Sequence, residues 1–220
     1  MDLTVIVTAG GIGNRMGASL PKQFLLLNNR PILFHTIESF FTFDAKAQIL
    51  VTLPEDWIPY WNELCEEYNF TIQHEVISGG QERYDSIKHA LKVTKGDKVL
   101  VHDGVRPLVS ERVIRNVLDS VNANNGVVPV LPLKSSIRKG TENESKAVNR
   151  SEYWMVQTPQ GFSREVIKKA YDYPFSEDIT DDSSLVAKAG YNIELVQGEE
   201  ENIKITTPFD LVIAAKIIES

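Results

Sequence analysis

Short apolar runs that end in glycine- or aspartate-containing loops recur along this chain and restrict the folds that it can adopt. The first run extends from Leu3 to Thr8 and opens into the loop Gly10-Gly11-Ile12-Gly13. A continuous run rich in β-branched residues is typical of a strand that is buried on both faces of a parallel sheet. Further strands are predicted by similar runs at residues 47–53, 71–77, 98–102, 126–130 and 192–196.

Helical patterns fill the intervals between these runs. Ser110 is a suitable N-cap for a segment whose apolar residues, from Val113 to Val121, lie on one helix face. Thr207-Pro208 marks the start of the last helix in the same way. Strands that alternate with helices predict a three-layer α/β/α, Rossmann-like fold around a mostly parallel sheet. Because no linker or repeat interrupts the 220 residues, we expect a single domain over 1–220.

One segment, residues 133–157, breaks this alternation. It is polar and has a turn-like stretch at residues 139–143, so we predict a β-hairpin arm that projects from the core. A hairpin with little core of its own is marginally stable in water, and the arm is therefore expected to pack on another subunit. We expect Trp154, like Trp57 and Trp61, to be a packing residue.

Composition argues against several classes of function. The net charge of −7 disfavours a nucleic-acid-binding surface, which normally carries a basic excess. No apolar run is long enough to span a membrane or has the basic flank of a signal peptide, which predicts a cytoplasmic protein with no membrane partner. The single cysteine, Cys65, cannot form an internal disulfide, and no histidine has metal-ligand spacing with it, so a structural zinc site is not expected.

The loop after the first strand, from Ala9 to Gly17, is the first of three candidate binding loops. Its glycines allow the backbone to approach a nucleotide closely and expose N–H groups to anionic oxygens. It lacks the Lys-Ser/Thr pair of a P-loop, and Met16 stands where the dinucleotide fingerprint needs a third small residue. Two cations, Arg15 and Lys22, flank the glycine turn. The simpler alternative is a tight turn with solvated cations.

The second and third loops follow later strands and are expected at the same edge of the sheet. Residues 78–86 form a glycine turn that opens a helix, where the backbone and Ser86 could bind the edge of a base. An ordinary strand-to-helix turn would have the same sequence. Residues 102–107 place Asp103 at a strand end, where a carboxylate could hold Mg²⁺ or a ribose. The alternative there is a salt bridge between Asp103 and Arg106.

These residues together resemble the 2-C-methyl-D-erythritol 4-phosphate cytidylyltransferase family of the non-mevalonate isoprenoid pathway. The resemblance covers nearly the whole chain, and its seven motifs are specific in this order although each is weak alone. They are the loop from Ala9 to Met16, Pro21-Lys22-Gln23, Gly79-Gly80-x-x-Arg83-x-x-Ser86, His102-Asp103-x-x-Arg106-Pro107, Gln157-Thr-Pro-Gln160, Thr180-Asp-Asp-Ser183 and Asn202-Ile-Lys204-Ile-Thr206. The resemblance implies a nucleotidyltransferase fold, transfer of CMP from CTP to a sugar-alcohol phosphate with release of pyrophosphate, and a homodimer clasped by the arm.

The resemblance also implies roles for individual residues. Arg15 and Lys22 would stabilise the transition state, and Arg150 and Lys204 would position the acceptor phosphate. Mg²⁺ would be the cofactor, held mainly by the phosphates of CTP, with Asp103 as its protein ligand. Substrate contacts would come from Ala9, Gly10, Gly11, Gly13, Gly80, Gln81, Arg83, Ser86, Asp103, Gly104, Arg106, Ser136, Thr158 and Thr180. The alternative for Thr180-Asp-Asp is a helix N-cap followed by acidic first-turn residues.

The identity of the acceptor leaves an alternative open. The arm contains Ser135-Ser136 where the family usually has Asp-Thr, so a hydroxyl is retained and a carboxylate is lost. Ribitol-5-phosphate cytidylyltransferase is therefore the alternative activity. The segment Arg150-x-x-Tyr-Trp154 favours 2-C-methyl-D-erythritol 4-phosphate as the acceptor.

Two other classes of protein fit the sequence less well than this family. A nicotinamide oxidoreductase is disfavoured by Met16 and by the lack of an acidic residue at the end of the second strand. A non-catalytic nucleotide-binding regulator would tolerate the loss of Lys22, so the presence of both Arg15 and Lys22 favours an enzyme.

Overall fold

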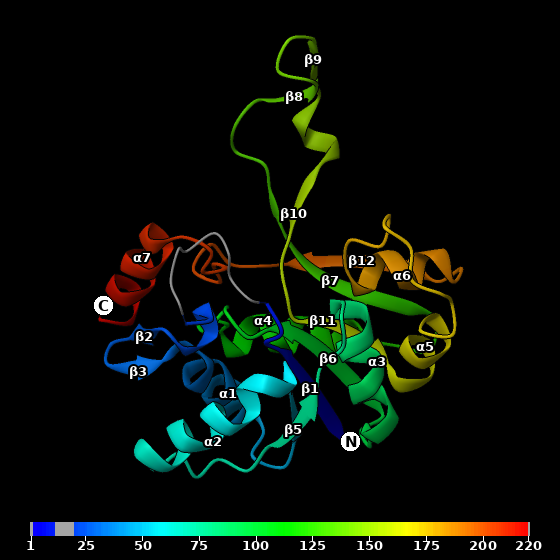
Figure 1. Cartoon of the computed structure of the whole chain (residues 1–220). Coiled ribbons are helices and arrows are strands. Elements are labelled where there is room, and N and C mark those ends of the chain that lie inside the picture. Colours follow the sequence, from blue (N-terminus) through cyan, green and yellow to red (C-terminus); the bar gives the residue numbers. More distant parts are fainter. Residues whose placement is uncertain (1, 12–19, 220) are drawn as a thin grey trace.

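An eight-stranded sheet runs through the computed structural model, which describes residues 2–11 and 20–219 (Figure 1). Its path is β10-β7-β11-β6-β1-β4-β5, and β12 also pairs with β7. The strands are β1 (Leu3–Thr8), β4 (Gln48–Leu53), β5 (Glu75–Ser78), β6 (Lys98–Asp103), β7 (Asn125–Pro132), β10 (Trp154–Val156), β11 (Gln160–Ser163) and β12 (Asn192–Gln197). All the predicted strands are therefore present in one sheet.

The sheet is mostly parallel, which confirms the prediction. Parallel pairs join β1 to β4 and to β6, β4 to β5, and β7 to β12. The strand β11 lies antiparallel between β6 and β7, and β10 is antiparallel to β7. Since β6 and β7 are both antiparallel to β11, they point in the same direction. The carboxyl ends of β1, β4, β6 and β7 consequently lie at the same edge of the sheet.

One strand boundary differs from the sequence-based expectation. The strand predicted at residues 71–77 begins only at Glu75. The preceding residues instead turn so that the His74 ring accepts a hydrogen bond from the Trp61 indole N–H at 3.0 Å, while His74 Nδ1 lies 2.8 Å from the Ile72 carbonyl oxygen. Side-chain packing against the helix layer therefore replaces strand pairing in this segment.

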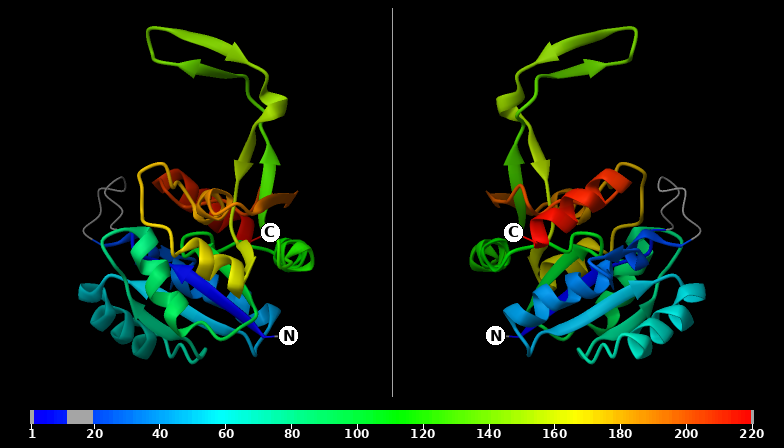
Figure 2. Two further views of the ribbon diagram at one scale, coloured as in Figure 1. Left: turned by 90° about the vertical axis from the view of Figure 1, so that its right-hand side faces the viewer. Right: turned by 90° about the vertical axis from the view of Figure 1, so that its left-hand side faces the viewer.

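Helices cover both faces of the sheet (Figure 2). One apolar cluster contains residues of α1 (Ile32–Phe43), α2 (Ile58–Glu67) and α4 (Glu111–Ser120). The opposite cluster contains residues of α3 (Arg83–Val93), α5 (Arg164–Ala170) and α6 (Asp182–Lys188). Burial on both faces explains why the strand runs are continuously apolar, and it confirms the three-layer architecture.

The last helix, α7 (Pro208–Ile218), packs in a separate small cluster. Its partners include the short strand β2 (Leu26–Leu27), which pairs with β3 (Arg30–Pro31). Turns of 3₁₀ helix occur at Lys22–Phe24, Glu55–Trp57 and Arg150–Glu152. Within residues 2–11 and 20–219, no helix has the length and apolar character needed to cross a membrane.

Two predicted helix starts are confirmed by their hydrogen bonds. The Ser110 hydroxyl accepts from the Val113 N–H at 3.2 Å at the start of α4. At the start of α7, the Thr207 hydroxyl accepts from the Asp210 N–H at 3.2 Å, and the Asp210 carboxylate accepts from the Thr207 N–H at 2.8 Å. These side chains satisfy backbone donors that a helix leaves unpaired at its first turn.

The predicted arm is present and projects from the sheet (Figures 1 and 2). It continues β7 into the hairpin β8 (Ile137–Gly140) and β9 (Ser145–Val148), and the chain then returns through β10. Trp154 lies at the base of the arm and is 48% exposed, as are Tyr153, Met155 and Val156 to similar extents. Within one chain Trp154 is therefore not packed, contrary to expectation, because β10 lies outside both helix layers. Trp61 is fully buried, as expected.

Candidate active site

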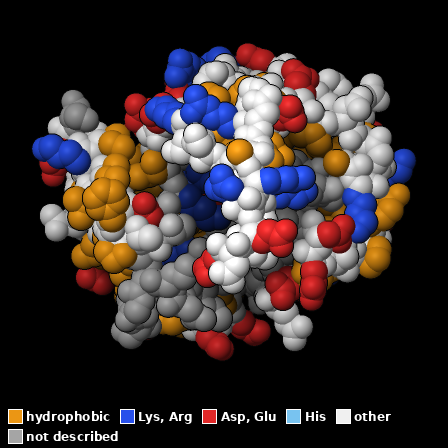
Figure 3. Space-filling model, turned by 90° about the horizontal axis from the view of Figure 1, so that it is seen from above, with side chains coloured by type: hydrophobic (Ala, Val, Ile, Leu, Met, Phe, Trp, Pro, Cys, Tyr) orange, Lys and Arg blue, Asp and Glu red, His pale blue; other side chains and the backbone are white. Residues whose placement is uncertain are grey.

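A cavity of about 570 Å³ lies at the carboxyl edge of the sheet, where β1, β4 and β6 end. Seen from above, Lys and Arg side chains gather in and around a central hollow (Figure 3). The described residues that line the cavity are Thr8, Ala9, Gly10, Gly11, Lys22, Gln23, Thr52, Gly80, Gln81, Glu82, Arg83, Ser86, Asp103, Val105, Lys204 and Thr206. The three candidate loops, which lie far apart in sequence, thus meet at one cavity.

Most of the predicted site residues lie around this cavity, and the remainder fall into three groups. Gly104, Arg106 and Thr158 are buried and are not among the described lining residues. Ser136, Arg150 and Thr180 are exposed and are also absent from the described lining. Arg150 donates a hydrogen bond to the Lys134 carbonyl oxygen within the arm. Arg15 and Gly13 lie outside the described residues.

The first glycine loop is fixed to the sheet at its beginning. The Ala9 N–H donates to the Thr52 carbonyl oxygen at 3.0 Å, and the buried Gln23 amide donates to the Ala9 carbonyl oxygen at 2.6 Å. A Cβ atom added to Gly11 would lie 4.0 Å from Lys22 Cε. The Lys22 side chain therefore runs beside the glycine backbone, at the place where an anionic ligand would approach the N–H groups.

The second glycine loop orients the Ser86 hydroxyl. This hydroxyl accepts from the Gly80 N–H at 3.1 Å and donates to the Glu82 carbonyl oxygen at 3.2 Å. A Cβ atom on Gly80 would lie 2.2 Å from Asp85 Cβ, so a side chain at that position would collide with the helix start. Because the hydroxyl proton is already donated, Ser86 can offer a ligand only an acceptor lone pair.

Asp103 lies among cations at the end of β6. Its Oδ2 atom is 3.0 Å from Arg106 Nε and 3.1 Å from Lys204 Nζ. Burial alone would raise the pKa of this carboxyl, but the charges of Lys204, Arg106 and Arg83 outweigh burial and hold the pKa well below its usual range. Asp103 is therefore ionised at neutral pH, and the simpler alternative of an Asp103–Arg106 salt bridge is present in the structure.

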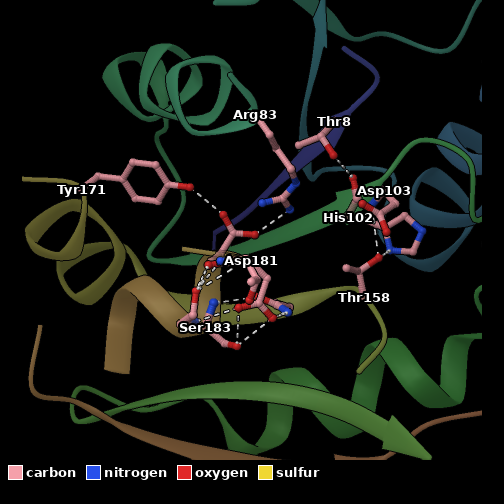
Figure 4. A network of polar contacts seen from close by, with 12 residues as sticks. Thr8, Arg83, His102, Asp103, Thr158, Tyr171, Asp181 and Ser183 are labelled. Atoms are coloured by element: carbon pink, nitrogen blue, oxygen red, sulfur yellow. Dashed lines mark hydrogen bonds and ion pairs between the residues drawn. The ribbon is translucent and has the colours of Figure 1, made fainter. Parts of the chain in front are cut away.

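A chain of hydrogen bonds beneath Asp103 fixes the His102 ring (Figure 4). His102 Nε2 lies 3.0 Å from the Arg106 carbonyl oxygen, which can only accept, so Nε2 carries the proton. Nδ1 then accepts from the Thr158 hydroxyl at 3.0 Å, and that hydroxyl accepts from the Asp103 N–H at 3.1 Å. Burial lowers the pKa of His102 to about 4, because the protonated, charged form of the ring is disfavoured when it is removed from water.

We expect this histidine to make folding stability depend on pH. In the unfolded chain a histidine has a pKa of about 6.5, so as the pH falls below that value the unfolded state binds a proton that the folded state does not accept until about pH 4. The free energy of unfolding should therefore fall between these values, with about 2 kcal/mol lost by pH 5. Urea unfolding at pH 7.5 and pH 5 measures the loss. A His102→Gln variant should lose about 2 kcal/mol less, and an equal loss in both proteins would contradict the prediction.

A second buried network joins α3 to α6 through Arg83, which lines the cavity (Figure 4). The fully buried Asp182 carboxylate receives the Arg83 guanidinium at 2.6 Å and the Tyr171 hydroxyl at 2.6 Å. The neighbouring Asp181 caps α6 by accepting from the Ser184 N–H at 2.8 Å, so the helix-cap alternative for the Thr180 segment is present. The pairing of Arg83 with Asp182 could not be predicted from the sequence, because the two residues are 99 positions apart and no spacing rule connects them.

The cavity offers a magnesium ion few protein ligands. Within residues 2–11 and 20–219, no three His, Cys, Asp or Glu side chains come together to hold a metal ion. Oδ2 of Asp103 already pairs with two cations, which leaves Oδ1 as the atom that could reach an ion. Magnesium is often bound by one carboxylate together with substrate phosphates, so these residues fit an ion carried mainly by a nucleotide.

The fold and this site define an α/β nucleotide-binding protein. Its cavity lies beyond the carboxyl ends of the strands, where open parallel sheets bind their ligands. Glycine turns supply exposed backbone N–H groups, Ser86 supplies a fixed acceptor, and Lys22 and Lys204 supply positive charge.

Comparison with known proteins narrows the class to a family. A family model described as 2-C-methyl-D-erythritol 4-phosphate cytidylyltransferase matches residues 3–220. The chain is 44% identical to the protein of that name from Bacteroides fragilis, over 99% of this chain and 100% of the relative. The crystal structure of the Thermus thermophilus protein of that name superposes with a TM-score of 0.82 at 31% identity and covers 100% of both chains. The chain belongs to the 2-C-methyl-D-erythritol 4-phosphate cytidylyltransferase family.

Proposed function

We propose that this protein transfers CMP from CTP to 2-C-methyl-D-erythritol 4-phosphate and releases pyrophosphate, in isoprenoid precursor biosynthesis. Family membership over residues 3–220 supports the reaction. The structural observation that carries the proposal is the single cavity in which the fixed Ser86 acceptor, two glycine turns and two lysines converge. The end of the cavity with Ser86 suits a base, and the end with Lys22 and Lys204 suits phosphates.

The hydrogen bonds of Ser86 support a preference for cytosine over uracil. Since its proton is given to the Glu82 carbonyl oxygen, the hydroxyl can accept but not donate toward the cavity. The exocyclic amino group of cytosine is a donor, whereas uracil presents a carbonyl oxygen at that position. A base with a donor there gains a hydrogen bond, and a base with an acceptor there leaves two lone pairs facing each other.

The proposed reaction needs no general base. A phosphate monoester has a second pKa of about 6, so the acceptor is already largely a dianion at neutral pH. The buried histidine at the site is unsuited to proton transfer, because both nitrogens of His102 are engaged within the protein. The catalytic problem is instead the repulsion between the attacking anion and the triphosphate.

Cations address that repulsion. Lys22, together with Arg15, would stabilise the charge that develops at the α-phosphorus and on departing pyrophosphate. Lys204 would hold the acceptor phosphate in line for attack, a role distinct from transition-state stabilisation. Magnesium, carried by CTP with Asp103 as its candidate protein ligand, would neutralise phosphate charge. The salt bridge with Asp103 positions Lys204 at 3.1 Å from that carboxylate.

The arm supports a homodimer as the working form. Tyr153, Trp154, Met155 and Val156 leave apolar side chains exposed at its base, and several exposed apolar side chains close together in a chain are typical of an interaction site. The exposed positions of Ser136 and Arg150 on the arm suit contacts with the acceptor of a neighbouring chain. A cytoplasmic location remains a prediction from the sequence.

A pyrophosphate-release assay tests the proposal. It crosses four nucleoside triphosphates with 2-C-methyl-D-erythritol 4-phosphate and ribitol 5-phosphate, in the presence of Mg²⁺. We expect the fastest turnover with CTP and methylerythritol phosphate, because the Ser86 acceptor matches cytosine and the curated relatives carry that acceptor in their name. A preference for UTP or for ribitol 5-phosphate would overturn the assignment.

A further inference from the structure

The buried threonine hydroxyls of this protein have hydrogen-bond partners, with one exception. Thr4 donates to Gln48, Thr36 to the Gly104 carbonyl oxygen and Thr94 to the Ala90 carbonyl oxygen, and Thr158 lies in the His102 chain. Thr52 is fully buried, yet its Oγ1 has no partner among the described residues. An unpaired buried hydroxyl costs free energy in the free protein, so a ligand that pairs with it recovers that cost.

The sheet register places Thr52 on the cavity floor. It pairs with Thr8 of β1, and Thr8 pairs with Asp103 of β6, so the three residues form a row across the carboxyl ends of adjacent strands. All three line the cavity. The Thr8 hydroxyl donates to the His102 carbonyl oxygen at 3.2 Å, and Asp103 pairs with cations, whereas Thr52 is unpaired among the described residues.

The side chain of Thr52 points toward the second glycine loop. Leu50, two residues earlier in β4, packs in the cluster that contains residues of α3, whereas Val51 and Leu53 pack in the opposite cluster. Since side chains alternate along a strand, Thr52 lies on the α3 face. Ser86 comes from the first turns of α3, and a Cβ atom on Gly79 would lie 3.0 Å from Ser86 Oγ and 3.2 Å from the Leu53 carbonyl oxygen.

We propose that the Thr52 hydroxyl is a binding contact for the nucleotide, at the base end of the cavity. Asn202 Oδ1 is the other unpaired buried side-chain atom in the described part, but Asn202 does not line the cavity. The proposal rests on the proposed function, since it takes CTP as the ligand. It assigns Thr52 a task different from that of Ser86. The Ser86 proton is committed, whereas the Thr52 hydroxyl is free to donate or to accept, so it adds affinity without selecting the base.

Two variants separate a hydroxyl contact from a packing role. Thr52→Val keeps the shape and removes the hydroxyl, and Thr52→Ser keeps the hydroxyl. Isothermal titration calorimetry with magnesium and CTP, and then UTP, measures affinity in the absence of an acceptor. We expect Thr52→Val to weaken CTP binding about five- to tenfold and UTP binding by the same factor, and Thr52→Ser to stay within about twofold of wild type.

Thermal unfolding of the free proteins supplies the second readout. Thr52→Val should melt at the wild-type temperature or above it, because a methyl group replaces an unpaired hydroxyl. The inference is overturned if Thr52→Val binds CTP like wild type, if Thr52→Ser is weakened as much as Thr52→Val, or if Thr52→Val melts clearly lower. A wild-type protein that binds no CTP would overturn the proposed function, and the inference with it. If the wild-type protein binds CTP and only these variant comparisons give an overturning result, the inference is wrong and the proposed function stands.

Discussion

Replacing Lys22 by alanine should lower kcat by about 100-fold or more and weaken CTP binding much less. The Lys22 side chain runs beside Gly11 in the first glycine loop, where the phosphates of a bound nucleotide would lie. A cation that acts mainly on charge developing in the transition state contributes little to ground-state affinity. Steady-state kinetics with CTP and methylerythritol phosphate, together with calorimetric CTP binding, separates the two effects.

Lys216→Ala is the matched control for this experiment. It removes the same charge from an α7 lysine whose side chain is 81% exposed and pairs with Glu219 at 3.3 Å. Its kcat should match that of wild type. A Lys22→Ala effect confined to KM would show that Lys22 only holds the ground state, and the transition-state role would then be wrong.

If the proposed homodimer forms, mixing the Lys22→Ala and Arg150→Ala proteins, each inactive alone, should restore activity to roughly a quarter of wild type. Lys22 belongs to the cavity of its own chain, whereas Arg150 lies exposed on the arm and is absent from the described lining. If the arm completes the site of the neighbouring chain, a mixed dimer has one site that lacks both Lys22 and Arg150. Its other site contains both residues and is intact. Random reassociation makes about half of the dimers mixed, and each contributes one good site of two.

Subunit exchange is the control for the mixing experiment. Differently tagged wild-type subunits should form mixed dimers under the same conditions, as followed by co-purification of both tags. When exchange is demonstrated and the mixed sample stays inactive, Arg150 acts within its own chain. The arm would then serve a role other than completing the partner's site.

Much of the fold could be predicted because the signals for it are local. Continuous apolar runs marked the strands, and the caps Ser110 and Thr207 marked helix starts through hydrogen bonds that span three residues. The strand β11 could not be predicted, because Gln160–Ser163 contains a glycine and two polar residues and becomes a strand only between β6 and β7. Its pairing is decided by the neighbours that it meets in the folded chain.

In the candidate site, too, some features follow from local sequence signals and others are decided only in the folded chain. The glycine loops and Asp103 could be assigned because strand ends in a parallel sheet share one edge. The same argument applies to Thr8, the last residue of its strand, and to Thr52, the last but one of its strand, but the sequence alone does not assign their hydroxyls to the site. The Arg83–Asp182 pair could not be found in this way, since a buried charge selects its partner in space across 99 residues.

The antiparallel strand β11 has a consequence for how two molecules can meet. Because β11 is antiparallel to both β6 and β7, those two strands run in the same direction. The strand β7 therefore ends at the edge of the sheet where the cavity lies, and the arm begins there. Two chains that exchange arms must then approach with their open mouths turned toward each other. In such a pair each cavity opening would be bounded partly by the other chain, and substrates would enter through a space that both chains share. A compound bound in that shared space would inhibit both subunits at once.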